Sequence, residues 1–326
     1  MEQARAGRGQ ARLGCLLVVL SLYAAAIGQS SPGNDAGTPQ KPQKEPVFRV
    51  NVRLVNVFAT VTDSHGAPIA GLTKGDFRIL EDGVPQTISV FDKESILPLS
   101  IVLAVDTSLS TIRDFKLETA SARKFAHSVV TRPVDHLQLF QVTEDIDQIT
   151  GFTSNLSVID RGIDNLRIGA GTSLYDAIFL ASDNLIDREG RKVLVLITDG
   201  GDTTSKANYQ SALRRAQQAE AIIYSIIVVP VANDAGRNTG GEHALMQISK
   251  DTGGKYYYAE SNKELDEAFR QISEELRTQY LIAYYPSRQV AENPFRRIEV
   301  QVTKPGGDGK SCQVRHRAGY YTAPAK

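Results

Sequence analysis

The chain has 326 residues with 37 basic and 37 acidic side chains, a formal net charge of zero, and 41% hydrophobic residues. This length and composition are typical of a globular protein with a large buried core. The balanced charge provides neither a basic surface for nucleic acid nor an acidic solvating tail, so we exclude nucleic acid as a partner.

The first 28 residues differ in composition from the rest of the chain. Three arginines precede an apolar run from Leu13 to Ile27, and small residues lie just before Gln29. This pattern predicts a signal peptide over residues 1–28, with cleavage near Gly28-Gln29 and a secreted or periplasmic protein. The run is short for a membrane span, which needs ~20 residues. We therefore expect membrane contact only if the signal stays uncleaved.

The next two segments are predicted to be a linker and a small β unit. Residues 29–46 contain four prolines and no apolar periodicity, which predicts a disordered spacer. Residues 47–95 show the period-two alternation of a half-buried strand. Asp82-Gly83 is a hairpin signal between Phe77–Ile79 and Thr87–Val90. We therefore expect an N-terminal β segment over residues 47–95.

Residues 97–278 alternate apolar runs with helical patterns, which predicts an α/β domain with a doubly wound, mostly parallel sheet. Continuous apolar runs such as Val193–Ile197 favour strands that are covered on both faces. The expected strands are Leu99–Val105, His136–Val142, Lys192–Thr198, Ala221–Val228 and Lys255–Tyr258. Helices are expected near residues 113–130, 155–166, 174–187, 207–219, 242–252 and 262–278.

The β pattern returns in residues 279–322, with strands expected at Tyr280–Tyr285, Ile298–Val302 and Cys312–His316. This C-terminal β segment and the N-terminal one are each too short to form a stable hydrophobic core alone. We therefore predict that they pair into one small β-sandwich, with the α/β domain inserted between them.

Polar residues follow two of the predicted strands and precede one helix. Because ligands bind outside the carboxyl ends of the strands in open α/β sheets, we expect these residues to lie together. They offer two carboxylates and three hydroxyls, which suit a hard cation, Mg²⁺ first and Mn²⁺ or Ca²⁺ as alternatives. Two carboxylates balance the ion, which can then take an anionic oxygen from outside. The five candidate metal ligands are Asp106, Ser108, Ser110, Thr172 and Asp199.

The D-x-S-x-S run at Asp106–Ser110, the later Thr172, and T-D-G at Thr198–Gly200 resemble the metal-ion-dependent adhesion site of von Willebrand factor type A domains. The resemblance extends from Leu99 to Thr278. It implies that the three hydroxyls coordinate the ion and that the two aspartates do so directly or through water. It further implies a protein partner whose Asp or Glu completes the shell. The flanking β segments resemble those of bacterial secreted proteins with a type A-related core.

Each part of the motif also has an ordinary structural explanation. Asp106 to Ser108 could be a helix-capping turn, and Asp199-Gly200 a common turn. Ser173 with Asp176 could form only a capping box for the helix that follows. Asp202 is near enough to join the site through water, but we interpret it as a solvated loop residue. The occurrence of all parts in order at predicted strand ends is what favours a metal site.

No catalytic residues are assigned. A metal-dependent phosphatase would carry D-x-D where this chain has Ser108, and the replacement removes the general acid or base. The sequence also contains no G-x-S-x-G or H-E-x-x-H motif. We therefore expect a non-enzymatic binding protein. The alternatives are a structural scaffold of an envelope assembly, with tyrosines such as Tyr256–Tyr258 as its interaction surface, and, less favoured, a metal-dependent hydrolase.

Overall fold

The computed structural model describes residues 54–93, 97–109, 115–229, 239–287, 294–303 and 312–322. The predicted signal peptide (1–28), the predicted spacer (29–46) and the candidate ligand Ser110 lie outside these residues. Within the described part of the chain, no helix combines the length and the apolar character that crossing a membrane requires.

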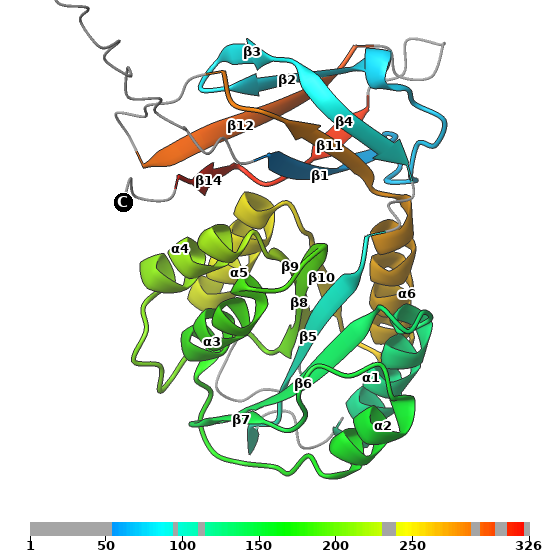
Figure 1. The fold of residues 1–326 in the computed structure, drawn as a ribbon. Coiled ribbons are helices and arrows are strands. Elements are labelled where there is room, and N and C mark those ends of the chain that lie inside the picture. Colours follow the sequence, from blue (N-terminus) through cyan, green and yellow to red (C-terminus); the bar gives the residue numbers. More distant parts are fainter. Residues whose placement is uncertain are drawn as a thin grey trace, which may run out of the picture. The chain divides into compact units, whose positions relative to one another are not determined.

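The central domain is built on a six-stranded sheet in the order β10-β9-β8-β5-β6-β7 (Figure 1). The five strands from β10 to β6 are parallel, and β7, which was not predicted, pairs antiparallel with β6. The predicted mostly parallel sheet is therefore confirmed. The strands are β5 (Leu99–Asp106), β6 (His136–Val142), β7 (Ile146–Gln148), β8 (Arg191–Thr198), β9 (Ile222–Val228) and β10 (Tyr256–Ala259).

Helices cover both faces of this sheet. Side chains of α1, α2 and α6 form one apolar cluster with the first face, and those of α3, α4 and α5 form another with the second face. The helices are α1 (Phe115–Val129), α2 (Leu156–Asp164), α3 (Leu174–Ile186), α4 (Tyr209–Ala219), α5 (Thr239–Thr252) and α6 (Asn262–Thr278).

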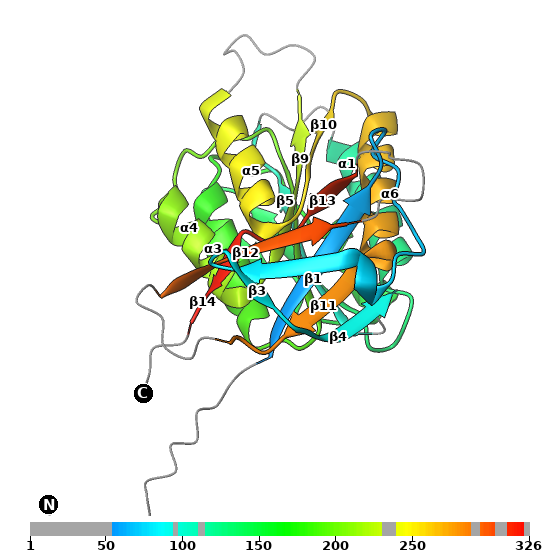
Figure 2. The same ribbon diagram turned by 90° about the horizontal axis from the view of Figure 1, so that it is seen from above.

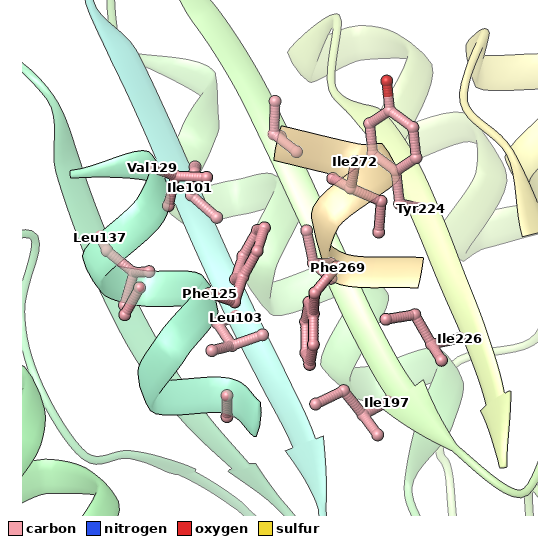
Figure 3. Close-up of a cluster of buried hydrophobic side chains, with 14 of the residues drawn as sticks. Ile101, Leu103, Phe125, Val129, Leu137, Ile197, Tyr224, Ile226, Phe269 and Ile272 are labelled. Atoms are coloured by element: carbon pink, nitrogen blue, oxygen red, sulfur yellow. The ribbon is translucent and has the colours of Figure 1, made fainter. Parts of the chain in front are cut away.

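The central strand β5 shows why the sequence gives this layering. Every residue of β5 is buried, and its side chains alternate between the two faces. Ile101 and Leu103 point toward α1 and α6, where Phe125 and Phe269 stack with ring centroids 4.6 Å apart (Figure 3). Val102 points to the opposite cluster. Burying each such side chain contributes about 1.5–3 kcal/mol, so β5 contributes to the packing of both helical layers.

The flanking segments form two four-stranded sheets, and each sheet takes strands from both segments (Figure 2). Their orders are β13-β1-β11-β4 and β14-β12-β2-β3, and the two sheets share one apolar cluster. The predicted sandwich with an inserted α/β domain is therefore confirmed. The strands are β1 (Val55–Thr62), β2 (Phe77–Glu81), β3 (Val84–Gln86), β4 (Ile88–Lys93), β11 (Tyr280–Tyr284), β12 (Phe295–Val302), β13 (Gln313–Arg315) and β14 (Gly319–Tyr321).

The hairpin prediction is correct at its turn and wrong in its second strand. Asp82 and Gly83 have φ values of 49° and 78°, the left-handed conformation that a two-residue hairpin turn requires. The strand that returns from this turn is β3, however, and not Thr87–Val90. The chain then crosses to the other sheet, where β4 pairs with β11. A pattern of alternating residues cannot distinguish these two partners.

Glu275 on α6 joins the α/β domain to the sandwich. Its side chain is 8% exposed. Its Oε1 accepts hydrogen bonds from the hydroxyl of Tyr224 on β9 at 2.6 Å and from Thr60 on β1 at 3.1 Å. Its Oε2 pairs with the guanidinium of Arg315 on β13. One buried carboxylate thus connects two strands of the sandwich with a strand and a helix of the α/β domain.

Candidate metal centre

Asp106 is the last residue of β5, at the carboxyl end of the sheet, and its side chain is 1% exposed. Its Oδ1 accepts the backbone N–H of Ser108 at 2.9 Å, and its Oδ2 accepts the Thr198 hydroxyl at 2.8 Å. Burial raises the pKa of this carboxyl to about 6; the charge of Asp199 raises it further, while the bonds from Ser108 and Thr198 lower it. Burial is thus the largest influence on the pKa of this carboxyl group.

Asp199 follows β8, the strand next to β5, so it reaches the same edge of the sheet. Its Oδ1 accepts the N–H of Gly201 at 3.1 Å. Gly200 has a φ of +88°, and a Cβ there would lie 3.3 Å from the backbone nitrogen of Glu242. Glycine therefore allows the tight turn that follows Asp199. The Thr198 hydroxyl, which donates to Asp106, also accepts the N–H of Gly200 at 3.1 Å.

Thr172 lies on a loop that hydrogen bonds to both of the other segments. The N–H of Gly169 donates to the carbonyl of Thr107 at 3.0 Å, beside Ser108. At the other end of the loop, the N–H of Thr172 donates to the Thr203 hydroxyl and the N–H of Thr203 donates back to the Thr172 carbonyl, both at 2.9 Å. This loop therefore lies against the segments after β5 and after β8.

The structure thus brings four of the five predicted ligands to one edge of the sheet. Asp106, Ser108 and Thr172 are buried, and Asp199 is partly exposed. Ser110 lies outside the described residues. No group of three or more His, Cys, Asp or Glu side chains gathers as a metal cluster in the described part of the chain. A cation here would therefore depend on two carboxylates and on hydroxyl oxygens, which suits Mg²⁺ and not Zn²⁺.

The capping-box interpretation of Ser173 and Asp176 is wrong. The Ser173 hydroxyl does not cap α3; it donates to the carbonyl of Glu144 at 2.6 Å. The Asp176 carboxylate accepts the backbone N–H groups of Lys206 and Ala207. Both side chains hold the α3 start against neighbouring loops, because their partners come from distant parts of the chain.

The sequence indicated a solvated loop position for Asp202 and no separate role for Thr198, and the structure corrects both. Asp202 is partly buried and not a freely solvated side chain, because its Oδ1 accepts the N–H of Leu174 at 2.9 Å and that of Tyr175 at 3.3 Å. It therefore caps the start of α3, although it lies 28 residues after Leu174 in the sequence. No local sequence signal shows such a partner. Thr198 was recognised only as part of T-D-G, yet its hydroxyl fixes Asp106.

A family model described as the von Willebrand factor type A domain matches residues 100–271, which is 172 of the 326 residues. No curated protein matches the chain.

Several solved structures are similar over part of the chain. The conserved hypothetical protein BatB from Bacteroides thetaiotaomicron is 17% identical, with a TM-score of 0.43, over 55% of this chain and 100% of its own. The vWF domain of the type V pili tip protein Mfa5 from Porphyromonas gingivalis is 13% identical, with a TM-score of 0.47, over 55% and 94%. The pilus adhesin SpaC from Lactobacillus rhamnosus GG, in an open conformation, is 11% identical, with a TM-score of 0.47, over 76% and 47%.

Proposed function

The chain belongs to the von Willebrand factor type A domain family, and from this premise we propose that it is a non-enzymatic protein-interaction module that uses a divalent cation. The cation, Mg²⁺ first and Mn²⁺ or Ca²⁺ as alternatives, binds at the carboxyl edge of the central sheet. Its ligands are Asp106, Ser108, Ser110, Thr172 and Asp199. When bound, the ion supplies an electrophilic centre that attracts an anionic oxygen of a partner.

The buried carboxylate of Asp106 is the observation that carries this proposal. Removing a carboxylate from water is unfavourable unless it is paired, and burial raises the pKa of this group to about 6. A cation beside Asp106 would offset that cost. The fixed bonds from Ser108 and Thr198 hold the carboxylate in one orientation, which is what a metal ligand requires.

The partner follows from the charge of the site. Two carboxylates neutralise a divalent ion and the hydroxyls add no charge, so an Asp or Glu of another protein can enter the coordination shell. No group in the donor set is a general acid, base or nucleophile of a recognised catalytic arrangement, which supports binding over catalysis. The N-terminal sequence supports export, with cleavage near Gly28-Gln29 and a secreted or periplasmic location.

Isothermal titration of the purified protein with Mg²⁺, Mn²⁺ and Ca²⁺ tests the site. We expect saturable binding to one site, and at least about a tenfold loss of affinity in Asp106→Ala because the ion then has one carboxylate. Asp187→Ala is the matched control, since Asp187 is exposed and follows the end of α3, whereas the candidate metal site lies near the start of that helix. Equal metal affinity in the wild type and Asp106→Ala would contradict the site.

A second assay separates the adhesion proposal from the scaffold alternative. Peptides that carry one Glu or Asp are titrated into the Mg²⁺-loaded protein, beside the same peptides with Gln or Asn. The adhesion proposal expects binding that needs both the acidic residue and Asp106. Binding that is unchanged by Asp106→Ala would favour a scaffold whose interaction surface lies in the β-sandwich or the tyrosines of β10.

A further inference from the structure

A cavity of about 360 Å³ lies at the edge of the sheet opposite to the candidate metal centre. Its lining includes Leu99 and Arg191, the first residues of β5 and β8, and Thr278, the last residue of α6. Parallel strands all begin at this edge, whereas Asp106 marks the edge where they end. This space is many times larger than a single water molecule needs, so a small solvated ligand fits.

The lining of this cavity is strongly cationic. Three of its residues are arginines (Arg132, Arg191 and Arg277), and Asp135 is the one carboxylate among the described residues that line it. Asp135 is already engaged: it accepts two hydrogen bonds from Arg132, at 2.9 and 2.6 Å, and the N–H of Leu99 at 3.2 Å. Counting these four side chains, the lining carries a formal charge of +2.

Arg191 is the buried member of the three, with an exposed fraction of 5%. Burial lowers the pKa of this guanidinium to about 10, and the positive charges of Arg132 and Arg277 also lower it. The two neighbours are more accessible: the Arg132 side chain is 39% exposed, and Arg277 is exposed as well. A ligand that enters from solvent therefore meets two guanidinium groups before it reaches the third.

Hydrogen bonds to backbone carbonyls account for only part of this arrangement. Arg277 donates one hydrogen bond to the carbonyl of Ser128 near the end of α1, and Arg132 donates one to the carbonyl of Leu97. Each guanidinium carries five N–H donors in a planar fork. For Arg277 this bond to Ser128 is the one hydrogen bond found among the described residues, so most of its donors remain for a ligand.

We propose that this cavity is an anion-binding site that takes a small oxyanion such as phosphate or sulfate. Guanidinium forks match the geometry of oxyanions, and a concave surface with charges of one sign concentrates counter-ions. Leu99 and Thr278 lie directly beside the two chain connections between the α/β domain and the sandwich. An anion bound between them stabilises the junction of the α/β domain and the sandwich.

The test is titration of the full chain with sodium phosphate and sodium sulfate in metal-free buffer, with sodium chloride at matched ionic strength as reference. We expect saturable heat for the oxyanions and at least about a tenfold loss of affinity in Arg277→Ala. Arg277→Lys should recover only part of it, because an ammonium lacks the planar fork. Arg270→Ala is the control, since Arg270 lies exposed on the same helix, pairs with Glu267 and Glu274, and does not line the cavity.

Three results would overturn the proposal. These are the absence of saturable heat, an Arg277→Ala affinity equal to that of the wild type, and an equal loss in Arg270→Ala. The last would show attraction by general surface charge. Sulfate also stabilises proteins by exclusion from their surface, so a rise in melting temperature counts in favour only when Arg277→Ala removes it. Because no metal is present, failure here leaves the proposed adhesion function untouched.

Discussion

Replacing Asp106 by Asn should stabilise the metal-free protein. The pKa of this buried carboxyl rises from 3.8 to about 6, and each factor of ten corresponds to ~1.36 kcal/mol. The ionised group therefore costs about 3 kcal/mol of folding free energy at neutral pH. Asn keeps the acceptor for the Ser108 N–H but loses the bond from Thr198, a loss of about 1 kcal/mol. We expect Asp106→Asn to be more stable by about 2 kcal/mol.

The size of this stability difference depends on pH. Because the folded state holds the proton more tightly than the unfolded state, the stability of the wild type from this group is fully present below pH 3.8 and is lost as pH rises through about 6. The Asn variant has no such loss. The difference in unfolding free energy between the two proteins should therefore be small near pH 4 and complete above pH 7, while all other titrating groups cancel.

Urea unfolding in metal-free buffer between pH 4 and 8 measures this difference, and repeating it with Mg²⁺ should stabilise the wild type alone. Asp187→Asn provides an exposed control that should change little. A variant that is no more stable than the wild type at pH 7.5, or a difference that does not change with pH, would refute the argument from burial.

Two further predictions concern the β-sandwich and its junction. Glu275→Gln removes the charge that faces Arg315, so we expect a loss of about 1.5–3 kcal/mol in urea unfolding. The exposed control Glu274→Gln should lose less than about 0.5 kcal/mol, and equal losses would contradict the role of Glu275. His316 accepts the N–H of Val300 at Nε2, and burial lowers its pKa below 6.5. The neutral imidazole therefore contributes its full stability above pH 6.5, and this stability is lost as pH falls through the lowered pKa. We expect His316→Gln to reduce the extent of acid unfolding, measured by circular dichroism. An acid transition that is the same in the variant and the wild type would contradict this role of His316.

Local sequence patterns predicted the α/β domain well because burial there follows simple periodicity. The run Val193–Ile197 is apolar throughout, and β8 is buried along its whole length. In α6, Leu265, Phe269 and Ile272 recur on one face, and all three pack in the same cluster. These elements could be predicted from sequence because each of their apolar faces packs against other apolar residues.

The remaining features depend on partners that are distant in sequence. The choice of β4 to pair with β11 and not with β2 is decided by packing of the two sheets, which alternation does not encode. Asp202 caps a helix that begins 28 residues earlier. The spatial grouping of Asp106, Thr172 and Asp199 was expected from strand order, but the role of Thr198 required the hydrogen bonds themselves.

The insertion of the α/β domain determines the order in which the molecule can assemble. Strand β1 pairs with β11 and β13, and the pair Val57 and Ile282 is 225 residues apart in the chain. Strands β2 and β3 can pair with each other, but β1 and β4 have partners only in the C-terminal segment and keep unpaired edges until that segment has been synthesised. The inserted domain contains its own core and can form first. Closure of the sandwich is then the final folding event, and a chain cut after α6 would leave β1 to β4 exposed to aggregation.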